Sequence, residues 1–152
     1  MEVNNNWDEK LKKNQLKITK ARIYILEELA RTTQPLSAED LHLSLRAQNI
    51  SVDLSTIYRT LELFTEKKIV CRINIFEDGR KLFALHSEKH CHYLVCKKCK
   101  KILTIHSCPI ALYTKNLEEK TGFSIDRHSL YLYGICKNCA NKSKSGIVSE
   151  KE

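Results

Sequence analysis

Three stretches in the first half of the chain carry apolar residues at helical spacing. After a short basic helix, the first stretch runs from Thr19, which can cap it, to about Arg31. The second begins after Ser37 and ends near Gln48, and the third covers residues 55–67. Their expected buried positions are Ile25, Leu26, Leu29, Ala38, Leu41, Leu45, Ile57, Leu61 and Phe64.

A strand-like hairpin follows the third stretch. Residues 70–75 and 81–85 flank Glu77-Asp78-Gly79, where Gly79 can supply the positive φ of a turn. Helix, short turn, helix and small hairpin in this order predict a winged helix-turn-helix domain. The last helix of such a domain lies in the major groove of DNA.

Polar residues on the outward face of that last helix suit contact with DNA. An aromatic ring can meet base methyls, a guanidinium can meet phosphate or guanine, and hydroxyls can meet phosphates. A run of cations at residues 10–22 has no acidic residue and can neutralise phosphates, although a solvated helix face is the plain alternative for both groups. The DNA-binding candidates are Lys17, Arg22, Ser55, Thr56, Tyr58 and Arg59.

The second half of the chain predicts a small α/β unit. Residues 93–95 and 102–105 are expected to be strands, residues 109–121 a helix, and residues 123–134 a final strand. Because the apolar residues are few, we expect a bound zinc ion and a partner subunit to stabilise this unit together. The polar tail at residues 141–152 is expected to be disordered.

Metal ligands are concentrated in this second half. The two Cys-X-X-Cys pairs, Cys96 with Cys99 and Cys136 with Cys139, supply the four ligands of a tetrahedral structural zinc site. Residues 89–152 carry 12 Lys and Arg against 5 Asp and Glu, whereas the preceding residues carry 14 against 13. The excess cations therefore lie beside thiolates whose charge they offset, and the formal net charge of +8 is weak evidence for DNA binding.

Disulfides and catalysis are the rival uses of these cysteines. The start of the chain is polar and carries no targeting segment, and no stretch is apolar enough to span a membrane, so we expect a reduced, cytoplasmic protein. A catalytic zinc site would need a general base, and only histidines that are themselves candidate metal ligands are available. With four glycines in the chain, no phosphate-cradling loop is visible either, so we expect no enzyme.

More thiols and imidazoles crowd the same region than one structural site can use. In a strand, His90 and His92 share one face and Cys91 takes the other, so this tripeptide can serve two metal sites. Surface or core histidines are the plain alternative, and His42, on a distant helix, has that interpretation. The further candidate ligands are Cys71, Cys91, Cys108, His86, His90, His92, His106 and His128.

On these motifs the chain resembles the ferric uptake regulator family of dimeric, metal-responsive bacterial repressors, over nearly all of residues 10–140. The resemblance rests on Ser37-Ala38-Glu39-Asp40-Leu41, on Ser55-Thr56-Ile57-Tyr58-Arg59-Thr60-Leu61, on the histidine-rich run before Cys96, and on residues 128–134 before Cys136.

The resemblance implies an α+β architecture with two domains. An N-terminal winged-helix domain at residues 1–88 would be followed, after a hinge near residues 84–90, by a metal-binding dimerisation domain at residues 89–140. It also implies a structural zinc held by four cysteines and at least one regulatory metal site at the hinge.

Within the family, the chain is most similar to the zinc uptake regulators. Pro35, Ala84 and Tyr93 stand where iron and peroxide sensors usually place histidine and acidic hinge ligands. The thiols and imidazoles that remain favour Zn(II), whereas Mn(II) or Fe(II) sensing depends on carboxylates. The implied regulatory site consists of Cys71, His86, Cys91 and His106, the last being a candidate for a position that a water molecule or an outer acidic residue can also fill.

A second regulatory site implied by the resemblance contains His90, His92 and His128. Its usual acidic ligand is replaced by Ala111, and either Cys108 or His106 can complete it. The chain is therefore expected to bind one structural and one or two regulatory zinc ions per subunit. Metal binding would close a homodimer onto a palindromic DNA operator, and zinc-uptake genes are the expected targets.

Two alternatives to a zinc-responsive repressor stay open from the sequence. One is an iron, manganese or peroxide sensor of the same family. The other is a repressor regulated by oxidation of Cys71, Cys91 or Cys108, with metal in a structural role alone.

Overall fold

The computed structural model describes residues 6–75, 79–87 and 91–144 of the 152-residue chain. The chain divides into two compact units, the first ending at His86 and the second beginning at Ser87. Both units combine helices with a small sheet, so the predicted α+β class is confirmed. Within the described ranges, no helix is long and apolar enough to cross a lipid bilayer.

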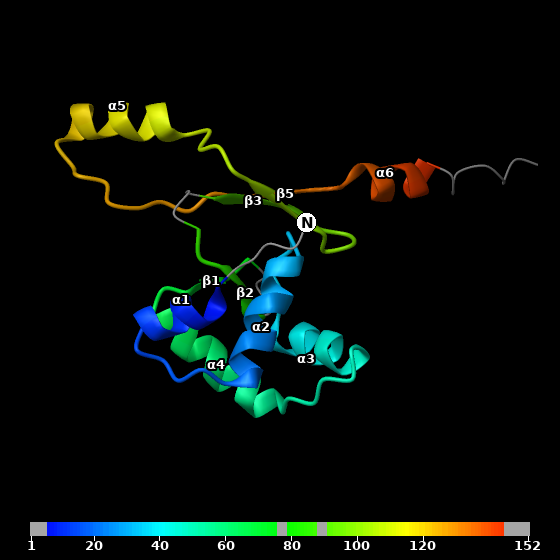
Figure 1. Ribbon diagram of the computed structural model, residues 1–152. Helices are drawn as coiled ribbons and strands as arrows, with labels where there is room; N and C mark the ends of the chain where they lie inside the picture. Colours follow the sequence, from blue (N-terminus) through cyan, green and yellow to red (C-terminus); the bar gives the residue numbers. More distant parts are fainter. Residues whose placement is uncertain (1–5, 76–78, 88–90, 145–152) are drawn as a thin grey trace, which may run out of the picture. The chain divides into compact units, whose positions relative to one another are not determined.

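Four helices and a two-stranded sheet make up the described part of the first unit (Figure 1). β1 and β2 pair antiparallel, with Cys71 opposite Ala84. This order of elements confirms the predicted winged helix-turn-helix, in which the sheet is the wing. The elements are α1 (Trp7–Lys13), α2 (Lys20–Arg31), α3 (Ala38–Ala47), α4 (Leu54–Glu66), β1 (Val70–Ile73) and β2 (Leu82–Leu85).

The helices of the first unit begin where side chains satisfy the amides of the first turn. Thr19 accepts a hydrogen bond from the Arg22 N–H at the start of α2, and Ser37 and Asp40 form a reciprocal capping box on α3. All nine positions predicted to face the core are buried. Gly79 has the expected positive φ of 76°, and Glu77 and Asp78 of the predicted turn lie outside the described residues.

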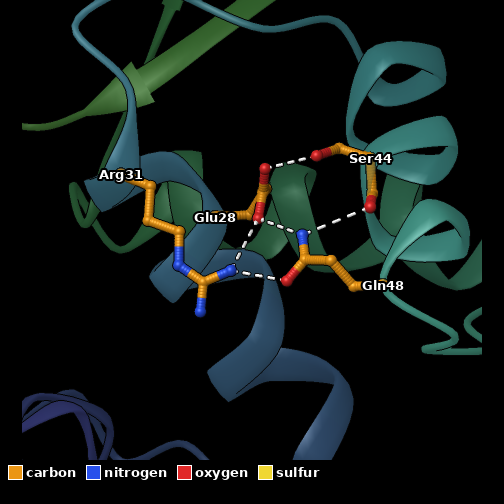
Figure 2. Close-up of polar contacts among 4 residues, drawn as sticks. All are labelled: Glu28, Arg31, Ser44 and Gln48. Carbon is orange, nitrogen blue, oxygen red and sulfur yellow. Dashed lines mark hydrogen bonds and ion pairs between the residues drawn. The ribbon is translucent and has the colours of Figure 1, made fainter.

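A polar network joins α2 to α3 beside this core (Figure 2). The Glu28 carboxylate accepts hydrogen bonds from the Ser44 hydroxyl and, at 2.8 Å, from Gln48 Nε2, and it pairs with Arg31 at 3.4 Å. Burial alone would raise the pKa of Glu28, but these donors together hold its pKa below the ordinary value. The network fixes α3 against α2, and α3 in turn packs on α4.

The second unit contains a three-stranded sheet and two helices in its described part (Figure 1). β3 is the central strand, antiparallel to β4 and parallel to β5. Its core is small, because Tyr93, Val95, Cys96 and Ile102 are the buried apolar residues among those described. The elements are β3 (His92–Cys96), β4 (Ile102–Ile105), α5 (Ala111–Thr121), β5 (Tyr131–Gly134) and α6 (Lys137–Lys144).

Several boundaries of the second unit differ from expectation, and β3 is one residue longer at each end than the predicted 93–95. Only Tyr131–Gly134 form the last strand, because β3 is five residues long and leaves residues 123–130 no strand to pair with in the described sheet. α5 starts at Ala111 rather than at residue 109, and it ends at Thr121, followed by the cap Gly122 with a φ of 73°. α6 includes residues 141–144, where a disordered tail was expected, while residues 145–152 lie outside the described part.

Candidate metal centres and DNA-binding surface

The parallel pairing of β3 with β5 brings the two cysteine pairs together. Cys96, the last residue of β3, pairs with Gly134, so Cys136, two residues after Gly134, comes close to Cys96. The Cys136 N–H donates to Cys96 Sγ at 3.3 Å, and Cys99 Sγ lies 3.7 Å from Cys136 Sγ. All four sulfurs, including that of Cys139, lie within 4.8 Å of one another.

The pKa values of these thiols also fit a binding site for a divalent cation. Backbone N–H groups of Cys99 and Cys136 lower the pKa of the Cys96 thiol to about 6. Contacts with Cys136 and Cys99 raise the pKa of the Cys139 thiol to about 12, because adjacent sulfurs oppose one another's ionisation. A thiophilic dication removes this conflict, and Zn(II) with four thiolates is the usual structural solution.

A second cluster joins β3 to the segments on either side of α5. The ligand atoms of His92, Cys108 and His128 lie within 4.8 Å of one another. Cys108 Sγ is 3.2 Å from His128 Nε2, and the rings of His92 and His128 stack with their centroids 5.1 Å apart. Of the two residues left open for this site, Cys108 is therefore the one that joins the cluster, and His90 lies outside the described residues.

The ligands predicted for the hinge site belong to both units. In the second unit, Cys91 before β3 and His106 after β4 are brought near by the antiparallel register, with Sγ 3.8 Å from Nδ1. In the first unit, Cys71 lies on β1 with its Sγ 3.5 Å from the Ala84 carbonyl oxygen, and His86 follows β2 with an exposed side chain. Each unit thus holds two of the four predicted ligands.

The outward face of α4 carries most of the predicted DNA contacts. Ser55, Tyr58 and Arg59 are exposed on this helix, and Thr56 is half-buried. Of the two remaining candidates, Lys17 precedes α2 and Arg22 lies in its first turn. The carbonyl oxygen of exposed Lys17 accepts a hydrogen bond from Nη1 of half-buried Arg22.

Two acidic residues on this surface were missed by sequence reasoning. The Glu39 carboxylate on α3 accepts a hydrogen bond from the Tyr58 hydroxyl. Glu62 on α4 pairs with Arg72 of β1 at 3.4 Å and with Lys81 beside β2 at 3.8 Å. Helical spacing can place a residue such as Glu62 on the outward face, but it does not indicate which distant side chain that residue meets.

Comparison with known proteins gives consistent matches over most of the chain. Residues 13–133 match the sequence model of the Ferric uptake regulator family. The chain is 33% identical over 135 residues to the Ferric uptake regulation protein of Neisseria gonorrhoeae, covering 88% of this chain and 93% of that protein. It is 38% identical over 127 residues to the protein of the same name from Escherichia coli strain K12, with coverage of 83% and 85%. The crystal structure of the Vibrio cholerae ferric uptake regulator is similar with a TM-score of 0.76 at 34% identity, covering 86% of this chain and 100% of that one.

Proposed function

This chain belongs to the ferric uptake regulator family of DNA-binding, metal-responsive transcription regulators, which are not enzymes, and we propose that it is a zinc-responsive repressor of zinc-uptake genes. In this proposal a homodimer binds a palindromic operator when its regulatory sites hold zinc. The four-cysteine cluster holds a separate, structural zinc ion.

The choice of zinc rests on one observation, the donor set of the second cluster. Cys108 Sγ lies 3.2 Å from His128 Nε2, beside the buried His92. Sulfur with imidazole nitrogen favours Zn(II), whereas Mn(II) and Fe(II) sites depend on carboxylate oxygens. Neither cluster of potential ligands among the described residues includes Asp or Glu. The relatives above are named for ferric iron, so the proposal separates this chain from them by its metal.

The regulatory mechanism follows from where the other proposed ligands lie. Cys71 and His86 would contribute from the wing of the first unit, and Cys91 and His106 from the second unit. Ligands that share one ion link their two units and favour one arrangement of the dimer over others. The free energy of that preference is what couples metal concentration to operator binding.

A homodimer is supported by the apolar surface of the second unit. No residue of α5 is buried, and Leu112 and Tyr113 on this helix are 73% and 65% exposed. On the sheet, Leu103 and Tyr133 are 56% and 49% exposed. Apolar exposure on this scale in a small unit is typical of an interface, and a second copy of the unit is the occupant that the proposal assigns.

Operator binding by ligand variants tests the proposal. Cys71→Ala and His86→Ala are expected to abolish zinc-dependent binding while the dimer and its structural zinc persist, because neither residue belongs to the four-cysteine cluster. Ser87→Ala, next to His86, is the matched control and should behave as the wild type. Zinc-dependent binding by both variants would show that the hinge site is wrongly assigned.

Oxidation separates the proposal from its redox alternative. Treating the reduced, zinc-loaded dimer with a mild oxidant should release zinc whenever operator binding is lost, because the regulatory thiols are ligands. Loss of operator binding with every zinc ion retained would instead assign the switch to thiol oxidation.

A further inference from the structure

Tyr58 is held at both ends on the surface that winged-helix domains present to DNA. It lies on α4 with 37% of its surface exposed, and its hydroxyl donates a hydrogen bond to the Glu39 carboxylate. The backbone of α4 therefore fixes one end of the side chain, and the hydrogen bond to α3 fixes the other. An aromatic ring held in one orientation loses less conformational freedom when it meets a base.

Glu39 is itself held in place by the start of α3. The capping box beside it closes through the Asp40 N–H, 3.0 Å from Ser37 Oγ, and the Ser37 N–H, 3.1 Å from Asp40 Oδ2. The hydrogen bond between the Glu39 and Tyr58 side chains lowers the pKa of Glu39 and raises the pKa of Tyr58. The pair thus stays a carboxylate and a neutral phenol at neutral pH, which makes the bond charge-assisted.

The Glu39 carboxylate lies where a negative charge disfavours DNA binding. Glu39 and Tyr58 line a cavity of about 590 Å³ together with Arg80 and Lys81 of the wing. Those cations suit phosphates, and Tyr58 and Arg59 of α4 suit base edges. A negative charge among them repels the DNA backbone, so general affinity alone gives no reason for an acidic residue here.

We propose that Glu39 is a specificity-determining positioning residue, whose carboxylate holds the Tyr58 ring in the orientation that reads operator bases. The proposal rests on the proposed function only in that α4 enters DNA, and it does not depend on which metal activates the dimer. The charge of Glu39 lowers the affinity for every DNA sequence alike, whereas its acceptor oxygen acts only on discrimination between sequences.

The test uses the full-length, metal-loaded dimer and two DNA probes. One is a duplex that the wild type enriches from a randomised library, and the other is a scrambled duplex of the same composition. Fluorescence anisotropy at several salt concentrations gives both affinities and their ratio. The variants are Glu39→Gln, Glu39→Ala, Tyr58→Phe and the double change Glu39→Ala with Tyr58→Phe, and Glu66→Gln, near the other end of α4, is the control with the same change of charge.

The expected results separate charge from positioning. Glu39→Gln keeps an acceptor oxygen, so it should preserve most of the ratio between the affinities for the enriched and the scrambled duplex. It should raise both affinities by roughly threefold per subunit, which is the effect of removing one charge about 6 Å from a phosphate in water. Glu39→Ala should raise the affinity for the scrambled duplex by a similar factor. It should also lower the ratio of the two affinities by about threefold to tenfold per half-site, which corresponds to the free energy of one hydrogen bond. Tyr58→Phe should lower the ratio alone, and the double change should lower it no further.

Three results would overturn the inference. An unchanged ratio in Glu39→Ala, with a lowered ratio in Tyr58→Phe, would mean that the hydroxyl acts on DNA without Glu39. Additive losses in the double change would mean that the two residues act separately. An equal rise in scrambled affinity in Glu66→Gln would mean that the charge of Glu39 has no special position relative to DNA. Failure of the wild type to enrich any duplex with any metal would instead refute DNA binding itself, and thermal melting checks that each variant is folded.

Discussion

Replacing Cys99 with serine removes one sulfur from the proposed structural zinc site and is expected to unfold the second unit while the first unit stays folded. Cys99 Sγ lies 3.7 Å from Cys136 Sγ in the four-cysteine cluster. A serine hydroxyl is a poor ligand for Zn(II) in a site built from thiolates. The variant is therefore expected to lose zinc at concentrations that keep the wild type loaded.

The size of the effect follows from the small core of the second unit. Apart from Cys96, which we propose as a zinc ligand, the buried apolar side chains in its described part are Tyr93, Val95 and Ile102. At about 1.5–3 kcal/mol for each buried side chain, they contribute roughly 5–9 kcal/mol. A structural zinc ion contributes about 10–16 kcal/mol in small zinc-binding peptides, so the metal is expected to stabilise this unit more than its core does. The first unit, by contrast, has a core cluster of fourteen buried residues and no part in this site.

Hydrogen exchange measured by mass spectrometry distinguishes the two units. The Cys96 N–H bonds to the Lys101 carbonyl at 2.9 Å and the Lys97 N–H to the Gly134 carbonyl at 2.8 Å, and these amides should lose protection in Cys99→Ser. Peptides from α2 and α4 should keep theirs. Cys71→Ser, a cysteine of the first unit outside the cluster, is the matched control and should retain the structural zinc and the protection of these β3 amides, even though it removes a proposed regulatory ligand.

The refuting result is equally direct. If native mass spectrometry showed that Cys99→Ser had lost its zinc, and the amides of β3 still exchanged as slowly as in the wild type, then zinc would not be what stabilises the second unit. Chelation of zinc from the wild type should reproduce the exchange pattern of the variant.

Three further changes test other parts of the molecule. Cys108→Asp exchanges sulfur for carboxylate, so metal competition should show zinc losing about tenfold or more of its preference over Mn(II), whereas Ser107→Asp should change nothing. Glu28→Gln should lower the free energy of unfolding by about 1–2 kcal/mol in urea at neutral pH, because its donors lose a charged acceptor. The folded pKa of Glu28 lies below its ordinary value of 4.5, so the difference in free energy of unfolding should be present above pH 4.5 and vanish as the pH falls through the folded pKa. A difference that persisted undiminished in acid would contradict this role of Glu28. Thr19→Ala should cost about 1 kcal/mol by removing the cap of α2, and Thr19→Ser should restore most of it in thermal melts.

The first unit was largely predictable because its signals are local. Thr19 and Ser37 mark helix starts by their own side chains, and the buried positions of α2, α3 and α4 repeat at helical spacing. The predicted last strand was wrong at its start for a non-local reason. Apolar residues at 123–134 satisfy a strand pattern, but a strand forms only where a neighbour offers hydrogen bonds, and β3 offers them to four residues.

The sequence indicated the candidate metal ligands, but it did not indicate which of them lie close together. Spacing of three identified both cysteine pairs, since that motif is local. Which residue joins His92 and His128 depends on how the segments around α5 fold back on β3, and spacing could not choose between Cys108 and His106. The contact between Glu39 and Tyr58, which are 19 residues apart, depends likewise on the packing of two helices.

The most direct test of the central claim is operator binding by the purified dimer under reducing conditions, with its structural zinc retained. The duplex enriched by selection is titrated separately with buffered Zn(II), Fe(II) and Mn(II). We predict that zinc alone switches binding on, because the proposed regulatory ligands are thiols and imidazoles. Activation by iron or manganese without zinc, or full binding with no added metal, would contradict a zinc-responsive repressor.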